Sequence, residues 1–327
     1  PIQGNILLKT KSILSSLTKN AYIYLLYTSG STGLPKSICL GNELLFNLIR
    51  WQIQSPLNTK EKCICLQYTP TAFDVSFQEL FFTLAVGGEL ILIGEDERKD
   101  MHCLYDHISK YKVTHLFIPP VTLLFLTSHC VEYNYFPSSL KHIVCAGEAL
   151  KITDDVKLFF TKLPGCSLHN HYGPAETHVV TAYTMHNDST KWPSIPPIGK
   201  PISNLRIQLL DKNKQQVPIG TPGFLHISSD LISPAYNDHK RSSDRFEKMT
   251  EEDKVLYRYN TGDLARFIEN GDIEYLGRND SQVKIRGHRI ELEEVEICIQ
   301  QHPSIVFAAA LVEAADTGNP VLSVLFV

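Results

Sequence analysis

Hydroxyl groups, glycines and one lysine gather in the segment YLLYTSGSTGLPKS, and they are the first residues suited to chemistry. The hydrophobic run is followed by Thr28, Ser29, Gly30, Ser31, Thr32 and Gly33. Their hydroxyls and backbone N–H groups can surround an anion, because glycine accepts the positive φ angles of such a loop. Lys36 adds a positive charge, but Leu34 and Pro35 interrupt the spacing of a Walker loop. We expect a phosphate-binding loop of a different kind.

Four other segments share this mixture of small, polar and charged residues. They are FDVSFQE from residue 73, NHYGPAETH from 170, YNTGDLARF from 259 and GRNDSQVKIRGHRIELEEVE from 277. Together with the loop, they resemble motifs of the adenylate-forming superfamily. That superfamily contains acyl-CoA synthetases, luciferases and the adenylation (AMP-binding) domains of nonribosomal peptide synthetases. The resemblance extends over nearly the whole chain.

The resemblance implies a site for ATP and Mg²⁺. Catalytic roles fall to Thr28, Lys36 and Glu176, of which Glu176 is also the expected metal ligand. Asn170 is expected to hydrogen-bond the adenine, and Tyr172 to stack on it. These assignments suit the groups, since a carboxylate is a hard oxygen ligand for magnesium. The implied cofactor-binding set is Ser29, Gly30, Ser31, Thr32, Gly33, Gly147, Glu148, Asn170, Tyr172, Gly173, Asp263, Arg278 and Lys284.

The segment from residue 277 resembles the family's hinge between a large and a small lobe. On this resemblance Asp263 accepts hydrogen bonds from the ribose hydroxyls, and Arg278 also contacts the ribose. Asp280 is the expected hinge, and Lys284 is a cation on the nucleotide side. Rotation of the small lobe about the hinge would switch the enzyme between adenylation and thioester formation.

The segment FDVSFQE resembles the pocket motif of domains that activate amino acids. There Asp74 pairs with the substrate ammonium, although an aspartate here also suits an ordinary helix N-cap. The remaining substrate-binding positions are Val75, Gln78, Phe117, Val144, Ala146, His171, Val179 and Val180. This set is mostly apolar and has no second charge, so it should reject charged side chains. It resembles the pockets of proline-activating domains, including those that take methylprolines.

The implied activity is ATP-dependent formation of an aminoacyl-AMP with release of pyrophosphate. The amino acid would then pass to the phosphopantetheine thiol of a peptidyl carrier domain, beside neighbouring synthetase modules. Two alternatives stay open: an acyl-CoA ligase of the same superfamily, which Asp74 argues against, and a non-catalytic module that binds nucleotide or carrier. A zinc site at His169, His171 and His178 is a further alternative, but no cysteine or carboxylate cluster supports it.

Some features depart from the family pattern. Ser37 replaces the usual glycine after the lysine, and Ala175 replaces a threonine. The long segment that precedes the phosphate loop in the family is absent. No lysine or arginine follows Arg289, although the family has a catalytic lysine near the end of the small lobe. We therefore expect the sequence to be a fragment with severely reduced adenylation.

The composition is that of a globular protein of 327 residues, 43% of them hydrophobic. A net charge of −4 gives no basic surface for nucleic acid, and no apolar run approaches the ~20 residues that span a membrane. The cysteines lie mostly in apolar segments without metal-site spacing: Cys39, Cys63, Cys65, Cys103, Cys130, Cys145, Cys166 and Cys298. Reduced core cysteines favour the cytoplasm.

Alternating strand and helix patterns predict an α/β fold with a mostly parallel sheet over residues 1–196. Within this part, the phosphate loop is expected between a strand and the helix GNELLFNLIRWQIQ. After a proline-rich crossing, strands and tight turns predict a β-rich subdomain over 197–277, with a hairpin turn at Asn270 and Gly271. Residues 278–327 are expected to form the hinge and a truncated α+β small lobe.

Overall fold

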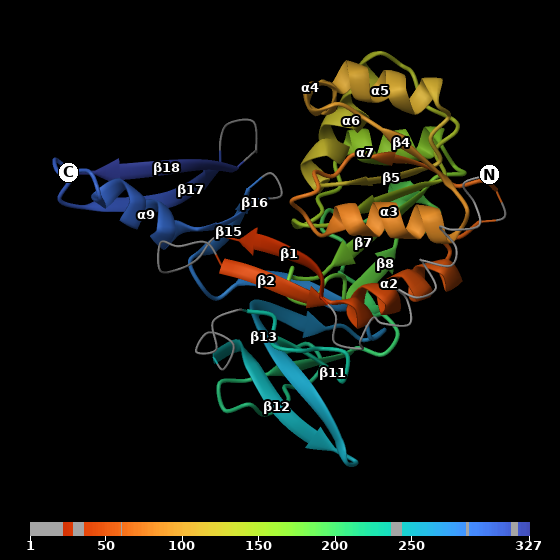
Figure 1. Ribbon diagram of the computed structural model, residues 1–327. Helices are drawn as coiled ribbons and strands as arrows, with labels where there is room; N and C mark the ends of the chain where they lie inside the picture. Colours follow the sequence, from red (N-terminus) through yellow and green to blue (C-terminus); the bar gives the residue numbers. More distant parts are fainter. Residues whose placement is uncertain (1–21, 29–35, 60, 237–243, 286–287, 315–319) are drawn as a thin grey trace, which may run out of the picture.

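A seven-stranded sheet is the largest element of the computed structural model, which describes residues 22–28, 36–59, 61–236, 244–285, 288–314 and 320–327 (Figure 1). Its strand order is β4 (Glu89–Leu92), β3 (Ile64–Gln67), β5 (His115–Ile118), β6 (His142–Cys145), β7 (Ser167–Tyr172), β8 (Thr181–Thr184) and β9 (Lys200–Pro201). Neighbours from β4 to β7 are parallel, whereas β8 and β9 add antiparallel pairs. The predicted α/β class with a mostly parallel sheet is confirmed.

Helices cover both faces of this sheet, because the central strands alternate their side chains between two hydrophobic cores. Phe117 and Val144 pack in the core beneath α2 and α3, whereas Leu116 and Ile143 pack beneath α5, α6 and α7. The helices are α2 (Asn42–Gln54), α3 (Val75–Ala85), α4 (Glu95–Lys99), α5 (Met101–Lys110), α6 (Pro120–Glu132), α7 (Asp154–Lys162) and the 3₁₀ turn η1 (Ser189–Lys191). No helix in the described ranges is long and apolar enough to cross a bilayer.

A hairpin precedes α2 and corrects one prediction. β1 (Tyr22–Thr28) pairs antiparallel with β2 (Lys36–Gly41), so the expected direct passage from loop to helix was wrong. β2 is held by tertiary contacts, since Ile38 and Leu40 are buried and the Cys39 N–H donates to the Ala235 carbonyl at 2.8 Å. Thr28 and Lys36 are paired at the end of the hairpin where the chain passes from β1 to β2.

A second sheet forms the predicted β-rich part. Its strands are β10 (Arg206–Leu210), β11 (Gly223–Ser229), β13 (Lys254–Phe267) and β12 (Phe246–Glu251), with β14 (Ile273–Arg278) also paired to β13. All of these pairs are antiparallel. The predicted turn at Asn270 and Gly271 joins β13 to β14, and Gly271 has a φ of 81°. The hairpin prediction is confirmed.

The described residues after Arg278 form two short hairpins and one helix. They are β15 (Gln282–Ile285), β16 (His288–Glu291), α9 (Leu292–Gln300), β17 (Ala308–Ala314) and β18 (Pro320–Phe326). Figure 1 shows α9, β17 and β18 projecting away from the large sheet, while β15 and β16 lie toward β1 and β2. All eight cysteines lack disulfides, and six of them are buried, as predicted.

Candidate active site

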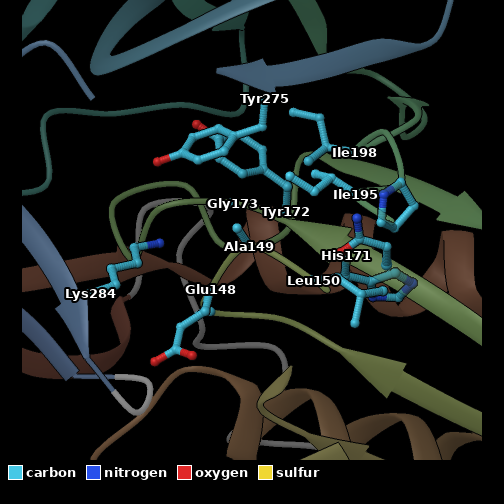
Figure 2. Close-up of a pocket in the computed structure, with 13 residues that line it drawn as sticks. Glu148, Ala149, Leu150, His171, Tyr172, Gly173, Ile195, Ile198, Tyr275 and Lys284 are labelled. Atoms are coloured by element: carbon cyan, nitrogen blue, oxygen red, sulfur yellow. The ribbon is translucent and has the colours of Figure 1, made fainter. Parts of the chain in front are cut away.

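A pocket opens at the carboxyl ends of β6 and β7, beside the second sheet (Figure 2). It is lined by Gly147, Glu148, Ala149, Leu150, Asn170, His171, Tyr172, Gly173, Ile195, Pro196, Ile198, Tyr275 and Lys284. Among these are the predicted nucleotide residues Gly147, Glu148, Asn170, Tyr172, Gly173 and Lys284. Carboxyl ends of parallel strands are the usual ligand site of such sheets. The predicted nucleotide residues in the pocket therefore come from three segments that are distant in sequence.

Two tyrosines form the aromatic side of the pocket. The rings of Tyr172 and Tyr275 lie with their centroids 6.0 Å apart, and Figure 2 shows their hydroxyls on the side where Lys284 enters. The Tyr172 hydroxyl donates to Asp263, which also accepts from Arg278 Nη1 at 2.9 Å. Burial and the charge of Asp263 raise the pKa of Tyr172 well above its usual value, so this hydroxyl stays a donor.

The loop after β7 approaches its own return path closely. A Cβ atom on Gly173 would lie 1.8 Å from the His178 carbonyl oxygen, so only glycine fits this position. Asn170 is buried, and its amide donates to the Pro197 carbonyl at 2.9 Å. Burial lowers the pKa of Lys284, whose ammonium would gain from an anionic ligand.

Glu176 is fully buried and forms an ion pair with Arg289. Arg289 Nη1 donates to both carboxylate oxygens, at 2.9 and 3.1 Å, and the Tyr236 hydroxyl donates to one of them at 2.5 Å. Burial opposes ionisation, but the charge of Arg289 and these hydrogen bonds outweigh it and lower the pKa of Glu176 to about 2. Glu176 is therefore a carboxylate held by a residue from beyond the predicted hinge.

Lys36 also forms an ion pair with a residue of β16. Its ammonium lies 3.1 Å from Glu291 Oε1, and both side chains are largely buried. Gln282 also donates to this oxygen, at 2.6 Å. The Oγ1 atom of Thr28 is buried without a hydrogen-bond partner in the described part of the chain. Strand β16 thus neutralises two of the predicted catalytic charges, through Arg289 and Glu291.

The predicted substrate pocket combines an apolar wall with one neutral polar pair. Phe117, Val144, Val179 and Val180 are buried in a single hydrophobic core, against which Val75 packs; Ala146 directly follows β6. The Gln78 amide donates to His171 Nδ1 at 3.2 Å, and Gln78 Oε1 has no partner among the described residues. Burial, with a smaller effect of His178, lowers the pKa of His171 to about 3. The pair is uncharged at neutral pH.

Asp74 caps helix α3 at the edge of this pocket. Its side chain accepts from the Val75 N–H at 2.8 Å, so the N-cap alternative is confirmed. Its backbone carbonyl accepts from His178 Nε2 at 3.1 Å. This cap uses only Oδ1 of the Asp74 carboxylate and leaves the other oxygen available to a ligand.

The remaining predictions concern the hinge residue Asp280, the loop residues 29–33 and the zinc alternative. Asp280 accepts from Arg278 at 2.6 and 2.7 Å and from Arg245 at 3.4 Å. The loop residues Ser29, Gly30, Ser31, Thr32 and Gly33 lie outside the described residues. The zinc alternative gains no support, because the described ranges contain no cluster of three metal-ligating side chains.

Sequence reasoning missed several residues that the structure places at the site. Arg289 and Glu291 lie within the quoted hinge motif, but nothing in their spacing indicates ion pairs with segments more than 100 residues away. Trp51 lies edge-on to the His171 ring, with centroids 5.7 Å apart. Tyr236 and Tyr275 are single aromatic residues in β-rich sequence, where they resemble ordinary core positions.

Known proteins are similar to this chain in sequence and in fold. The family model described as AMP-binding enzyme matches residues 7–237. Gramicidin S synthase 2 of Brevibacillus brevis is 40% identical over 303 residues, which make up 91% of this chain and 7% of that protein. Tyrocidine synthase 2 of Brevibacillus parabrevis is 40% identical over 302 residues, or 91% of this chain and 8% of that protein. The chain thus spans less than a tenth of these relatives.

A solved structure with the same fold is holo-PA1221, an NRPS protein containing adenylation and PCP domains bound to a vinylsulfonamide inhibitor. The TM-score is 0.82 at 25% identity, over 95% of this chain and 53% of that one. The fold predicted from the motifs is therefore confirmed.

The buried pair of Glu176 and Arg289 should make a large contribution to stability. Replacing Arg289 by Met leaves a buried carboxylate unpaired, which costs about 3–5 kcal/mol. We expect this loss in the free energy of unfolding, measured by chemical denaturation followed by tryptophan fluorescence. The matched control is Arg206→Met, which breaks the exposed pair with Glu251 and should cost about 1 kcal/mol or less. Equal losses in the two variants would contradict the assignment.

The same carboxylate should give the protein an acid-labile component of stability. Its pKa is lowered from 4.5 to about 2 in the folded state, so its stabilisation is complete above pH 4.5 and is lost as pH falls toward 2. The contribution is about 3 kcal/mol. Thermal unfolding from pH 6 to 2 should show a smaller acid-dependent loss in Glu176→Gln than in the wild type. The same acid-dependent loss of stability in both proteins would show that other groups control acid unfolding.

Proposed function

The chain belongs to the AMP-binding enzyme family, and from this premise we propose that it activates an amino acid as its adenylate. The observation that carries the proposal is Asp74, the capping carboxylate of α3, at the edge of an apolar pocket. A carboxylate there can neutralise a substrate ammonium, a group that fatty acids lack. Similarity over 91% of the chain to nonribosomal peptide synthetases supports the same class of substrate.

In the proposed reaction, a carboxylate oxygen of the amino acid attacks the α-phosphorus of ATP. The bond from the α-phosphorus to its bridging oxygen breaks, and pyrophosphate leaves. Tyr172 and Asn170 would hold the adenine, while Asp263 and Arg278 would hold the ribose. Lys36, Thr28 and the loop from Ser29 to Gly33 would bind the phosphates. Positioning of this kind, with charge stabilisation, accounts for most of the catalysis in phosphoryl chemistry.

Magnesium is the metal implied by this chemistry, and Glu176 suits it. Mg²⁺ is commonly held by one or two carboxylates together with substrate phosphates, so a larger protein cluster is not required. When bound, it would neutralise charge on the phosphates. Both oxygens of Glu176 accept from Arg289 in this structure, so Arg289 would have to withdraw first. Tyr236, which donates to the same carboxylate, would keep it in place.

Proline or a methylproline is the proposed substrate. Phe117, Val144, Val179 and Val180 offer a compact apolar wall, and the pair of Gln78 and His171 carries no charge. A second charge on the substrate would be buried without a partner, which strongly disfavours acidic and basic amino acids. Discrimination between similar apolar side chains is weaker, about 1–3 kcal/mol per methylene.

The proposed partner is a peptidyl carrier domain, to whose phosphopantetheine thiol the amino acid passes. Similarity to an adenylation protein that carries such a domain, and to multimodular synthetases, supports this partner and neighbouring modules. We propose residues 1–196 and 197–277 as parts of the large lobe and 278–327 as the start of the small lobe, with the hinge at Asp280. The ion pairs of Arg278 and Arg245 to Asp280 would have to rearrange on rotation.

The test is amino-acid-dependent exchange of pyrophosphate into ATP by the full-length protein. The panel contains proline, a ring-methylated proline, leucine, aspartate and lysine. We expect exchange with proline or methylproline and none with the charged amino acids. Exchange driven only by another amino acid would refute the proline assignment. Trapping of acyl hydroxamates from fatty acids would favour an acyl-CoA ligase, and nucleotide binding without any exchange would favour a non-catalytic module.

Asp74→Ala should reduce this exchange at least about 30-fold, because loss of a buried charge partner costs about 2–5 kcal/mol. The matched control is Asp100→Ala. Asp100 is the N-cap of α5 and accepts from the N–H groups of His102 and Cys103 at 2.8 and 3.2 Å. The control loses a helix cap of similar value, about 1 kcal/mol, without touching the pocket. Equal exchange in the two variants would show that Asp74 is only a cap.

A further inference from the structure

His178 lies between the two halves of the substrate pocket, although it is not one of the predicted pocket residues. It is buried, with 1% of its surface exposed, and it directly precedes Val179 and Val180. We propose that His178 is a positioning residue that fixes the distance between Asp74 and the wall formed by Val179 and Val180. This inference rests on the proposed function, because it takes Asp74 as the partner of the substrate ammonium.

The two ring nitrogens of His178 contact opposite sides of the pocket. Nδ1 accepts from the backbone N–H of Val179 at 2.9 Å, and Nε2 donates to the backbone carbonyl of Asp74 at 3.1 Å. The first contact fixes the start of the valine wall, and the second fixes the first turn of α3. One ring therefore bridges segments 104 residues apart.

These contacts require a single tautomer of the neutral ring. Nδ1 has to carry the lone pair and Nε2 the proton, because an N–H cannot accept and a carbonyl cannot donate. A doubly protonated ring would lose the contact to Val179.

The backbone of His178 shows that this placement is enforced by the fold. Its φ is 59°, in the left-handed region that residues other than glycine seldom adopt. The carbonyl lies where a side chain on Gly173 would otherwise be, and the Val180 N–H donates to the Tyr172 carbonyl at 2.8 Å. Strained residues of this kind persist where surrounding contacts determine them, and they concentrate at binding sites.

The two contacts can be separated by substitution. His178→Gln keeps an amide N–H that can reach the Asp74 carbonyl. His178→Asn keeps an acceptor close to the position of Nδ1 and tolerates a positive φ, but it is too short to reach Asp74. If the bridge positions Asp74, the Asn variant should bind the amino acid about tenfold more weakly, and the Gln variant should stay within about threefold of the wild type.

The experiment measures KM for the amino acid and for ATP in pyrophosphate exchange by the full-length wild type and both variants. A rise confined to the KM of the amino acid, and present only in His178→Asn, supports the proposal. Unchanged amino acid KM values in both variants, or equal changes in both KM values, overturn it while leaving the proposed function intact. Absence of exchange in the wild type would overturn the proposed function and this inference together.

A spectroscopic measurement keeps the proposal testable if a variant folds poorly. Nitrogen-15 chemical shifts of the labelled imidazole report which ring nitrogen carries the proton, without any need for activity. We expect a protonated Nε2 and an unprotonated Nδ1 in the wild type at neutral pH. The opposite tautomer, or a doubly protonated ring, would overturn the bridge.

Discussion

The buried ion pair between Glu176 and Arg289 is the constraint on which the arrangement of this protein depends. Glu176 follows the last parallel strand of the large sheet, Tyr236 lies between β11 and β12, and Arg289 comes from beyond the predicted hinge. A carboxylate in this position cannot stay ionised alone, because desolvation opposes the charge. Three parts of the chain are therefore drawn to one point, and the pocket lined by Tyr172 and Tyr275 forms beside it.

Strand β16 supplies a positive charge in the place of the proposed metal ion and a negative charge in the place of a proposed phosphate. The guanidinium of Arg289 lies where a metal ion would neutralise Glu176, and the carboxylate of Glu291 lies where a phosphate would neutralise Lys36. Asp263 is likewise satisfied by Tyr172 and Arg278. Binding of nucleotide and metal would exchange these internal partners for external ones. The site is thus stable without ligands and keeps the charges that the proposed chemistry needs.

Sequence reasoning succeeded where a local pattern determines the structure and failed where tertiary contacts do. The turn at Asn270 and Gly271 and the cap at Asp74 follow from local backbone preferences. β2 was missed because its six residues are held as a strand by β1 and by Ala235. Helix α6 was not predicted, because it is apolar on most of its surface and lacks a two-sided pattern of polar and apolar residues. The partners of Glu176 and Lys36 depend on the fold, so no spacing in the sequence could indicate them.

The most direct test of amino acid adenylation is the binding of a non-hydrolysable prolyl-adenylate analogue, measured by calorimetry. This measurement requires no turnover, and its ligand would occupy the proposed nucleotide pocket and the proposed substrate pocket together. The account predicts that the prolyl analogue binds about 100-fold more tightly than the same nucleotide without the amino acid, and that Asp74→Ala removes this difference. Equal affinity for the two ligands would contradict it.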